Sequence, residues 1–446
     1  LPAAAAERLV ALLQSSHPVP HPALDEVRRA LAPDAAGRFV HALFEQWRAH
    51  GADAAERWVI AALGWFPDDA RNDDRLALAT EWHAGGRTRR AGALLDAVAE
   101  QGTEAALLGL DELARGGSTR ALRRRARRAI ARAAGRRGLT PEAFEDRTAP
   151  TLGLDPSGAR ALDLGGRRVM VTLDDSLRPV LRDAAGRPRS RLPAPRVADD
   201  PDAHAAARAA LRELRRDARR VEAQQRARLE RAMVRGRVLS VAELRARFVA
   251  HPVVRRLADR LVWIALTPTG PRPFRVAEDD TLADAEDDEL VLEPSTRVRL
   301  AHPWDLTAEA RARWAERLAD YGLVQPFEQL GRAVFTLPEA AVVAGRLLDL
   351  EGGVVDWRAV DALRRRGFDG RGADGPRVTR FEGEVFDVPV RIRVDPGLHV
   401  GSPQGSGRQR VVRADAPLRD LEAVLRSEIR RALSGLAGPI PPGRSS

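Results

Sequence analysis

The stretch that decides the fold begins with DAHAAARAALRELRRDARRVEAQQRARLERAMV (202–234) and ends at Arg332. Apolar residues in its first part recur at steps of three and four, which predicts a long helix from Ala205 to Val234. Such a helix spans about 45 Å. Its apolar stripe is thin and consists of Leu211, Leu214, Ala218, Val221, Leu229 and Met233. A helix with so little apolar surface needs other segments packed along it.

The segments after this helix predict a mixed α+β core over residues 148–336. Ser240 and Glu243 have the spacing of a capping box, which predicts a helix over Val241–Val249. Thr307 is a good N-cap for a helix that ends at Asp320, before Gly322. Strands are expected at Leu261–Thr267, Pro273–Val276, Leu290–Leu292 and Val298–Ala301. An earlier strand is expected around Val169–Leu173, where apolar and polar residues alternate.

Residues 1–147 have helical periodicity throughout, with Gly, Pro or Asp in most gaps. Paired short helices with Ala and Leu faces predict HEAT-like α-helical repeats, in which each pair packs on its neighbours. The helices are expected at Ala3–Leu13, Pro22–Leu31, Ala36–His50, Ala54–Leu63, Arg87–Glu100, Glu104–Arg115 and Thr119–Ala134.

Residues 337–437 are expected to form a small C-terminal α+β module. Helices are predicted at Pro338–Leu350, Asp356–Arg366 and Leu418–Leu433, and strands at Val378–Phe381 and Val385–Val394. The Pro/Gly/Ser-rich end, residues 438–446, is expected to be a disordered tail. The predicted fold class is therefore helix-rich α+β: helical repeats, then a mixed core, then the small module.

Composition excludes several chemistries. The 446 residues include no cysteine, and the basic side chains are 73 arginines without a single lysine. Disulfides, thiolate metal sites, cysteine nucleophiles, P-loop lysines and Schiff bases are therefore excluded. No apolar run is long enough to span a membrane. A cytoplasmic protein is expected, and the start at Leu1 suggests that a segment precedes it.

Several short motifs together resemble a known family. They read Gly138-Leu139-Thr140, Leu152-Gly153-Leu154, His251-Pro252, Leu261-Val262-Trp263 and the closing Gln325-Pro326-Phe327-Glu328-Gln329-Leu330-Gly331-Arg332. This series is similar to the bacterial family called domain of unknown function 4132, which includes molybdate metabolism regulator-like proteins. The resemblance covers roughly Leu139 to Arg332. Similar proteins often have helical repeats ahead of this domain, and some carry a Trp-Gly-Arg domain. The Trp-Gly-Arg tripeptide does not occur in this sequence. The resemblance supplies no catalytic residue.

Two His-Pro pairs are the candidates for a catalytic site. His251 and His302, with Glu328, could form a proton-transfer or metal site if the fold brought them together. The alternative is that each histidine lies at a helix or strand boundary and bonds to backbone. No metal-ligand spacing such as HExxH supports a metal, and no cofactor or metal is predicted.

Two other motifs favour structural interpretations. The acidic run 278–289 contains no glycine of the kind that a calcium loop needs, so it is expected to be an exposed hairpin tip. The Gly-rich stretch 401–407 lacks the spacing of a phosphate-binding loop and is expected to be flexible.

Arginine clusters are the candidates for nucleic-acid contacts. They are Arg123, Arg124, Arg127, Arg212, Arg216 and Arg220. The alternative is that these arginines fill the solvated faces of their helices. Arginine is in excess from Asp202 to Arg247, and acid is in excess from Pro273 to Pro294, so these two charge blocks are expected to face each other or lie close together.

The leading hypothesis is a bacterial, non-catalytic binding or regulatory scaffold that holds a protein partner on its helical repeats. The second is a nucleic-acid-associated protein that binds weakly and without sequence specificity through its arginine-rich helices. The third is an enzyme with a site near His251, His302 and Glu328. No membrane association is expected.

Overall fold

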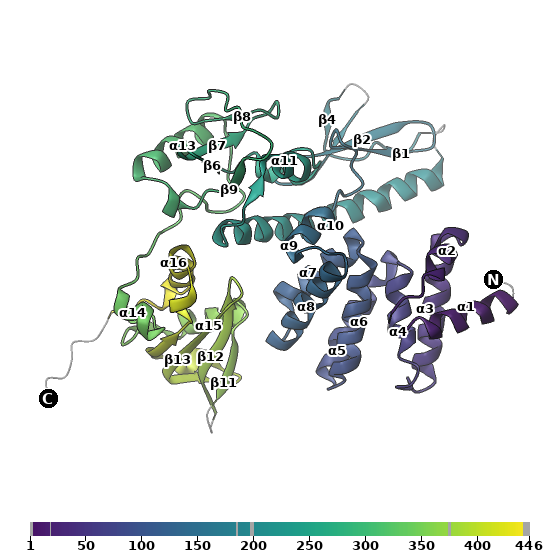
Figure 1. Cartoon of the computed structure of the whole chain (residues 1–446), viewed down its shortest axis with the longest axis horizontal. Coiled ribbons are helices and arrows are strands. Elements are labelled where there is room, and N and C mark those ends of the chain that lie inside the picture. Colours follow the sequence, from purple (N-terminus) through teal and green to yellow (C-terminus); the bar gives the residue numbers. More distant parts are fainter. Residues whose placement is uncertain (1–2, 18, 184–185, 197–199, 373–375, 440–446) are drawn as a thin grey trace. The chain divides into compact units, whose positions relative to one another are not determined.

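The computed structural model describes residues 3–17, 19–183, 186–196, 200–372 and 376–439. Its contacts divide the chain into two compact units, Leu1–Pro150 and Thr151–Ser446 (Figure 1). Helices and three small antiparallel sheets make the whole an α+β structure, as the sequence predicts.

The first unit contains only helices within its described residues, which confirms the prediction of no sheet there. One continuous apolar core runs through it. Whether its helices repeat in the HEAT-like manner stays a prediction. The elements are α1 (Ala3–Ser15), α2 (Ala23–Ala30), α3 (Pro33–Ala49), α4 (Trp58–Trp65), η1 (Asp69–Arg71), α5 (Asn72–Ala84), α6 (Thr88–Gln101), α7 (Glu104–Gly116), α8 (Arg120–Arg136) and α9 (Pro141–Arg147).

The sequence pattern does not predict helix α5, because polar side chains occupy part of its buried face. Arg75 is buried, and the Asn72 amide donates to the Gln101 side chain at 2.9 Å. These residues interrupt the apolar stripe on which a helix prediction depends. Trp82 nevertheless anchors α5, since its ring lies 6.2 Å from Phe44 and 6.5 Å from Trp47, centroid to centroid.

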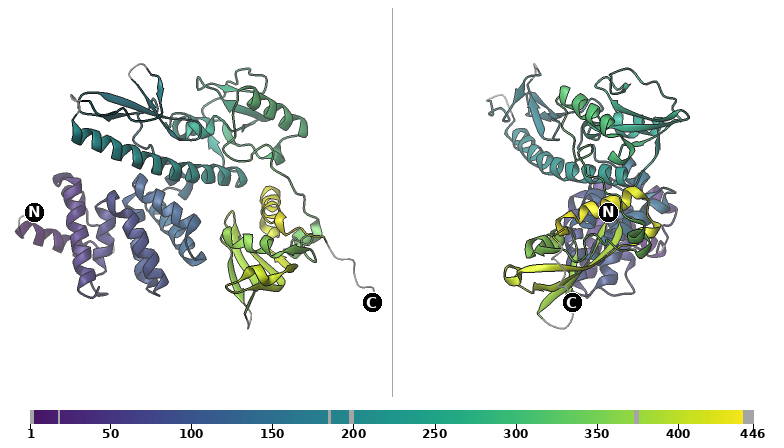
Figure 2. Two further views of the ribbon diagram at one scale, coloured as in Figure 1. Left: turned by 180° about the vertical axis from the view of Figure 1, so that it is seen from behind. Right: turned by 90° about the vertical axis from the view of Figure 1, so that its left-hand side faces the viewer.

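The second unit is organised along α10 (Pro201–Val234), which begins four residues before the predicted start. The Asp200 carboxylate accepts from the Asp202 amide, and Pro201 occupies the first turn, where its missing amide hydrogen carries no penalty. All six residues of the predicted apolar stripe are buried. The helix contacts two sheets and the C-terminal helix α16 (Ala423–Ala432) (Figures 1 and 2).

The three sheets of this unit are antiparallel. The first has the order β1 (Ala159–Asp163), β2 (Arg168–Leu173), β3 (Pro179–Arg182), β4 (Pro188–Arg189). The second has the order β5 (Leu239–Ser240), β9 (Arg297–Leu300), β6 (Trp263–Thr267), β7 (Gly270–Val276), β8 (Leu282–Ala283). The third has the order β10 (Val354–Asp356), β14 (Arg408–Asp415), β13 (Val388–His399), β12 (Arg377–Val385), β11 (Asp369–Gly372).

Short helices connect these sheets. They are α11 (Val241–Leu244), the π-helical turn η2 (Arg245–Val249), α12 (Arg255–Ala258), η3 (Pro303–Asp305), α13 (Ala308–Asp320), α14 (Glu339–Ala344), α15 (Trp357–Arg365), η4 (Pro403–Ser406), η5 (Leu418–Asp420) and η6 (Ser434–Leu436). Both the Ser240–Glu243 capping box and the Thr307 cap are present, as the sequence predicts.

Several predictions for this unit are wrong in detail. Residues 290–292 form no strand: the neighbouring Glu289 makes an isolated bridge with Ala283, and the Leu290 amide donates to the Leu282 carbonyl at 2.7 Å. The predicted helix Pro338–Leu350 ends at Ala344, since Gly345 takes a left-handed conformation with φ of 64°. Strand β14 was not predicted. The division at about residue 337 stays a prediction.

The predicted tail begins with ordered residues. The Val354 amide donates to the Pro439 carbonyl at 3.2 Å, and a Cβ on Gly438 would meet the Val354 carbonyl oxygen at 2.3 Å. Residues 440–446 lie outside the described part of the chain. Among the described residues, no helix combines the length and the apolar character that a bilayer span requires.

Replacing Trp263 by Ala should destabilise the protein by about 3–5 kcal/mol. Trp263 is 1% exposed, its ring stands edge-on to Phe248 at 5.6 Å, and its indole N–H donates to the Ala258 carbonyl at 3.1 Å. Trp304, which is 37% exposed, is the matched control, and its replacement by Ala should cost less than about 1 kcal/mol. Urea unfolding of both variants measures the difference; equal losses would contradict the assignment of Trp263 to the core.

Candidate functional site

His302 lies at the end of β9 and is completely buried. Its Nδ1 accepts the Trp304 amide at 3.1 Å, which caps η3. Because Nδ1 is an acceptor, the ring proton resides on Nε2, 3.1 Å from a carboxylate oxygen of Glu428. The interaction joins β9 to α16, 126 residues later in the chain. The sequence singles out His302 but gives no sign of its partner.

Glu428 is the centre of a buried charge network. It is fully buried, as is Arg332, whose Nη1 donates to it at 2.7 Å. Arg332 also pairs with Glu230 of α10, and Arg431 donates to Glu428 at 3.0 Å. Burial alone would raise the pKa of Glu428, but the hydrogen bonds from His302 and Arg431 and the charge of Arg332 outweigh it and hold that pKa below its usual value.

No direct contact joins the three residues proposed as a catalytic group in the described part of the chain, and a shared site stays a prediction. Glu328 exposes 60% of its side chain, and its carboxylate lies 3.8 Å from Arg431 Nη1. Its backbone carbonyl accepts from Arg332 Nε at 2.8 Å. His251 lies before α12, where its Nδ1 accepts the amides of Val253 and Val254. Each histidine therefore caps a turn, and His302 also bridges two elements.

The closing motif fixes the sheet next to this network. The Gln329 side chain is fully buried and donates to the carbonyls of Val262 and Ala301, each at 2.8 Å. Its oxygen accepts the Val262 amide at 3.0 Å and the Gln325 amide at 2.7 Å. The motif thus joins the start of β6 and the end of β9 to the loop that carries Arg332.

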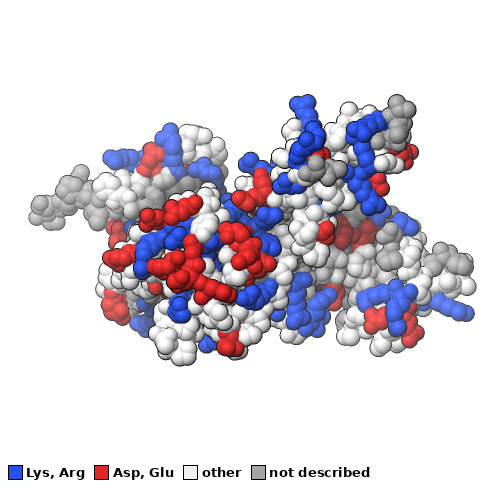
Figure 3. Space-filling view, turned by 90° about the horizontal axis from the view of Figure 1, so that it is seen from above, with Lys and Arg blue, Asp and Glu red and all other residues white. Residues whose placement is uncertain are grey.

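The acidic run takes its ion-pair partners from nearby elements, and Arg245, which belongs to the basic block 202–247, donates to the Asp280 carbonyl at 3.1 Å. Whether α10 itself lies close to the acidic run stays a prediction. Arg255 pairs with Asp280, Arg313 with Glu286, and Arg317 with Asp287. Arg275 also pairs with Asp287 and lies 4.2 Å from the centroid of the Tyr321 ring. Figure 3 shows acidic and basic side chains interleaved on the surface of the molecule seen from above. The hairpin tip is largely exposed, as the sequence predicts.

The arginines proposed for nucleic-acid contacts have different environments. Arg123 is buried and donates to the Gly117 carbonyl at 2.6 Å, whereas Arg124 is exposed. Arg127 is half-buried. On α10, Arg212 and Arg216 are exposed and Arg220 is half-buried; Arg216 bonds to Asp217 at 3.0 Å. A contact with nucleic acid stays a prediction for this set.

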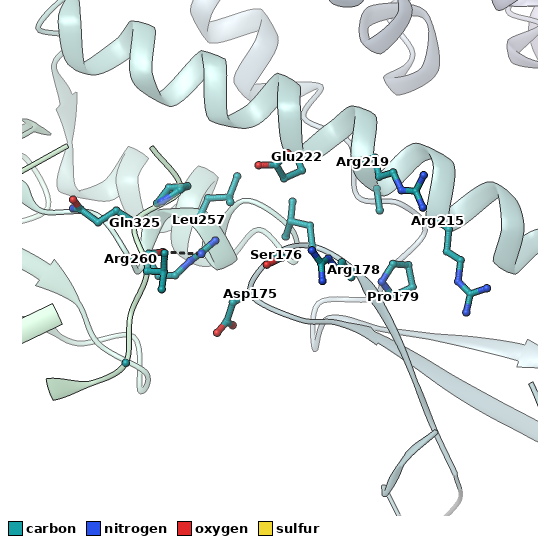
Figure 4. Close-up of a pocket in the computed structure, with 15 residues that line it drawn as sticks. Asp175, Ser176, Arg178, Pro179, Arg215, Arg219, Glu222, Leu257, Arg260 and Gln325 are labelled. Atoms are coloured by element: carbon teal, nitrogen blue, oxygen red, sulfur yellow. Dashed lines mark hydrogen bonds between the residues drawn. The ribbon is translucent and has the colours of Figure 1, made fainter. Parts of the chain in front are cut away.

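A pocket of about 830 Å³ opens beside α10 (Figure 4). Four segments of the second unit line it: the β2–β3 turn, α10, the end of α12 and the loop at 322–326. Its charged residues are Asp175, Arg178, Arg215, Arg219, Glu222 and Arg260. The sequence singles out neither this pocket nor its arginines, because these residues lie far apart in the chain.

Asp259 is a half-buried carboxyl between the side chains of α12 and the β2–β3 turn. One of its oxygens is buried without a hydrogen-bond partner in the described part of the chain. Burial raises the pKa of Asp259 to about 6, against the lowering effect of Arg260 and Arg256. It adjoins Arg260, which lines the pocket.

Among the described residues, neither a metal-binding cluster nor the Gly-rich stretch provides a further candidate binding site. Within the described residues, no three His, Asp or Glu side chains gather to hold a metal ion. The Gly-rich stretch 401–407 lies in the connection between β13 and β14: Ser406 is buried, its hydroxyl accepts the His399 amide, and its carbonyl accepts from Gln409.

Comparison with known proteins supports the motif-based assignment. Residues 186–368 match the family model described as Domain of unknown function (DUF4132). The resemblance to that family is confirmed. The matched DUF4132 segment starts and ends later than the motifs suggest, and it includes α10, the second sheet and the closing motif. No solved structure matches the chain.

The chain is also similar to the uncharacterized protein YehI of Escherichia coli. The two are 30% identical over 380 residues, which are 84% of this chain. The chain spans only 31% of that relative's length.

Replacing Glu428 by Ala should cost about 3–5 kcal/mol at pH 7, because Arg332 would stay buried without its fully buried partner. Glu328→Ala is the matched control, and we expect a change within about 0.5 kcal/mol. The pKa of Glu428 is lowered by folding, so its contribution is complete above the usual carboxyl range and is lost as pH falls through the folded-state pKa. Chemical denaturation should therefore show a smaller difference at pH 4 or below; a difference independent of pH would refute this account.

Replacing Asp259 by Asn should stabilise the protein at pH 7–8 by about 1–3 kcal/mol. The raised pKa means that the folded state holds a proton which the unfolded chain releases, so stability falls as pH rises from about 4 to about 6. The variant removes that loss and should match the unmodified chain near pH 4. Thermal unfolding across this range tests it, with exposed Asp420→Asn as control. A destabilised Asp259→Asn variant at pH 8 would show that the buried carboxylate is favourable.

Proposed function

We propose that the protein is a non-catalytic, cytoplasmic regulatory scaffold that holds an acidic protein partner against α8 of its helical unit. The observation that carries this proposal is a contrast within one helix. In the C-terminal half of α8, Arg132 and Arg136 pair with Asp96 and Glu100 of α6. In the N-terminal half, Arg124, Arg125 and Arg128 have no ion-pair or hydrogen-bond partner in the described part of the chain.

The arginines in the N-terminal half of α8 destabilise this helix slightly. Arg124 and Arg128 are exposed and one turn apart, and like charges at this spacing destabilise a helix by about 0.2–0.5 kcal/mol. Packing does not require them, since the buried face of α8 consists mainly of alanines with Leu122 and Ile130. Guanidinium groups held on an ordered helix suit carboxylate recognition, because each can donate two parallel hydrogen bonds.

The side chains at these sites are better suited to binding an anion than to catalysing a reaction. The histidine and glutamate of the buried network are inaccessible to a substrate, since both are fully buried. A guanidinium group keeps its proton at neutral pH, so it binds anions but does not transfer protons.

The double charge reversal Arg124→Glu/Arg128→Glu should weaken binding of a Glu-rich peptide at least tenfold, measured by fluorescence anisotropy at low salt. Arg8→Glu is the matched control, because Arg8 is an exposed arginine of α1 with no recorded partner, and it should bind like the unmodified chain. Equal binding by the double variant and the unmodified chain would refute the proposal. Duplex DNA that binds more tightly than the peptide at physiological salt, with the same dependence on these arginines, would favour the nucleic-acid alternative instead.

A further inference from the structure

The pocket beside α10 contains a buried cation without a counter-charge in contact. Arg260 is 6% exposed. Its Nε and Nη1 donate to the carbonyls of Arg256 and Val324, at 2.7 and 2.9 Å. No carboxylate of the described residues forms an ion pair with it. Burial lowers the pKa of Arg260, and the charges of Asp259, Asp175, Glu222 and Asp174 oppose this without forming an ion pair with it in the described part of the chain. Because an unpaired buried charge is costly, an anion in the pocket would relieve a cost already present in the fold.

Three more guanidinium groups border the same space. Arg178 projects from the β2–β3 turn, and Arg215 and Arg219 project from α10 on the other side (Figure 4). All three are exposed and have no recorded partner in the described part of the chain. Four arginines therefore face two carboxylates, Asp175 and Glu222, which leaves the lining with an excess of positive charge.

The other lining residues indicate that the ligand has an organic part in addition to its anionic group. Leu177, Pro179, Leu257 and Pro326 supply apolar walls, and Ser176 and Gln325 supply neutral hydrogen-bonding groups. Asp175 and Glu222 can accept from hydroxyl or amino groups. A volume of about 830 Å³ lies in the range of sites for small organic ligands.

We infer that this pocket binds a small organic phosphate of about nucleotide size. Guanidinium groups of the lining, among Arg178, Arg215, Arg219 and Arg260, bind the phosphate, because their planar forks match phosphate oxygens in pairs. The organic part lies against the apolar walls, and its hydroxyl or amino groups donate to Asp175 and Glu222. This site is separate from the α8 surface proposed for the protein partner.

Helix α10 carries further arginines on the face that borders the pocket, and these serve as a control for the binding experiment. Arg208, Arg212, Arg215 and Arg219 follow one another at steps of four, three and four and so share one helix face. Only Arg215 and Arg219 line the pocket. A small phosphate needs only these two, whereas a single-stranded nucleic acid, whose phosphates extend along the backbone, would use the whole row.

Isothermal titration with AMP, pyrophosphate and inorganic phosphate tests this inference, and a twelve-residue oligothymidylate is the comparison ligand. We expect AMP to bind more tightly than inorganic phosphate. Arg178→Ala and Arg215→Ala/Arg219→Ala should each weaken AMP binding at least tenfold, and Arg208→Ala/Arg212→Ala should change it less than twofold. All of these side chains are exposed, and an unchanged melting temperature confirms that each variant is folded.

Three outcomes would overturn the inference. The first is that no phosphate probe binds the unmodified chain at millimolar concentration. The second is that the Arg208/Arg212 variant loses as much affinity as the Arg215/Arg219 variant. The third is that the oligothymidylate binds much more tightly than AMP and depends on all four arginines of the row, which would make this face a nucleic-acid surface.

Discussion

The second unit depends on the packing of α10 between otherwise separate elements. A helix of 34 residues with a narrow apolar stripe gains little stability by itself, and most of it must come from tertiary contacts. Its first half packs against the first sheet, where Ala207, Leu211 and Leu214 join the apolar side chains of β1, β2 and β3. Its second half contacts β9 and α16, and Glu230 there pairs with Arg332.

The buried charges determine how the elements meet at the end of this helix. Glu428 of α16 is satisfied only when His302, Arg332 and Arg431 all lie in place, since a fully buried carboxylate needs several donors. Gln329 adds a second polar anchor, because it bonds at once to Val262, just before β6, and to Ala301, just after β9. Apolar packing would tolerate small rotations between these elements, whereas hydrogen bonds of fixed direction do not.

The sequence predicts those features that depend on local pattern. Helical periodicity locates most of the first unit, and caps at Ser240 and Thr307 locate helix starts, because both signals lie within a few residues. Helix α5 was missed where buried Asn72 and Arg75 replace apolar residues. The site was harder to predict for a related reason. His302 could be singled out, but Glu428 and the pocket arginines acquire their roles only through contacts between residues far apart in the chain.

The two halves of α10 also restrict how this segment can change in evolution. Each residue added to a helix turns everything beyond it by about 100° and advances it by about 1.5 Å. A single insertion in the middle of α10 would therefore direct Leu229 and Met233 to solvent while Leu211 and Leu214 stayed in place. Insertions of about 7 or 11 residues nearly restore the original orientation of the side chains beyond the insertion. Natural homologues should accordingly keep this helix at constant length or change it in steps of that size, with matching changes in the sheets alongside.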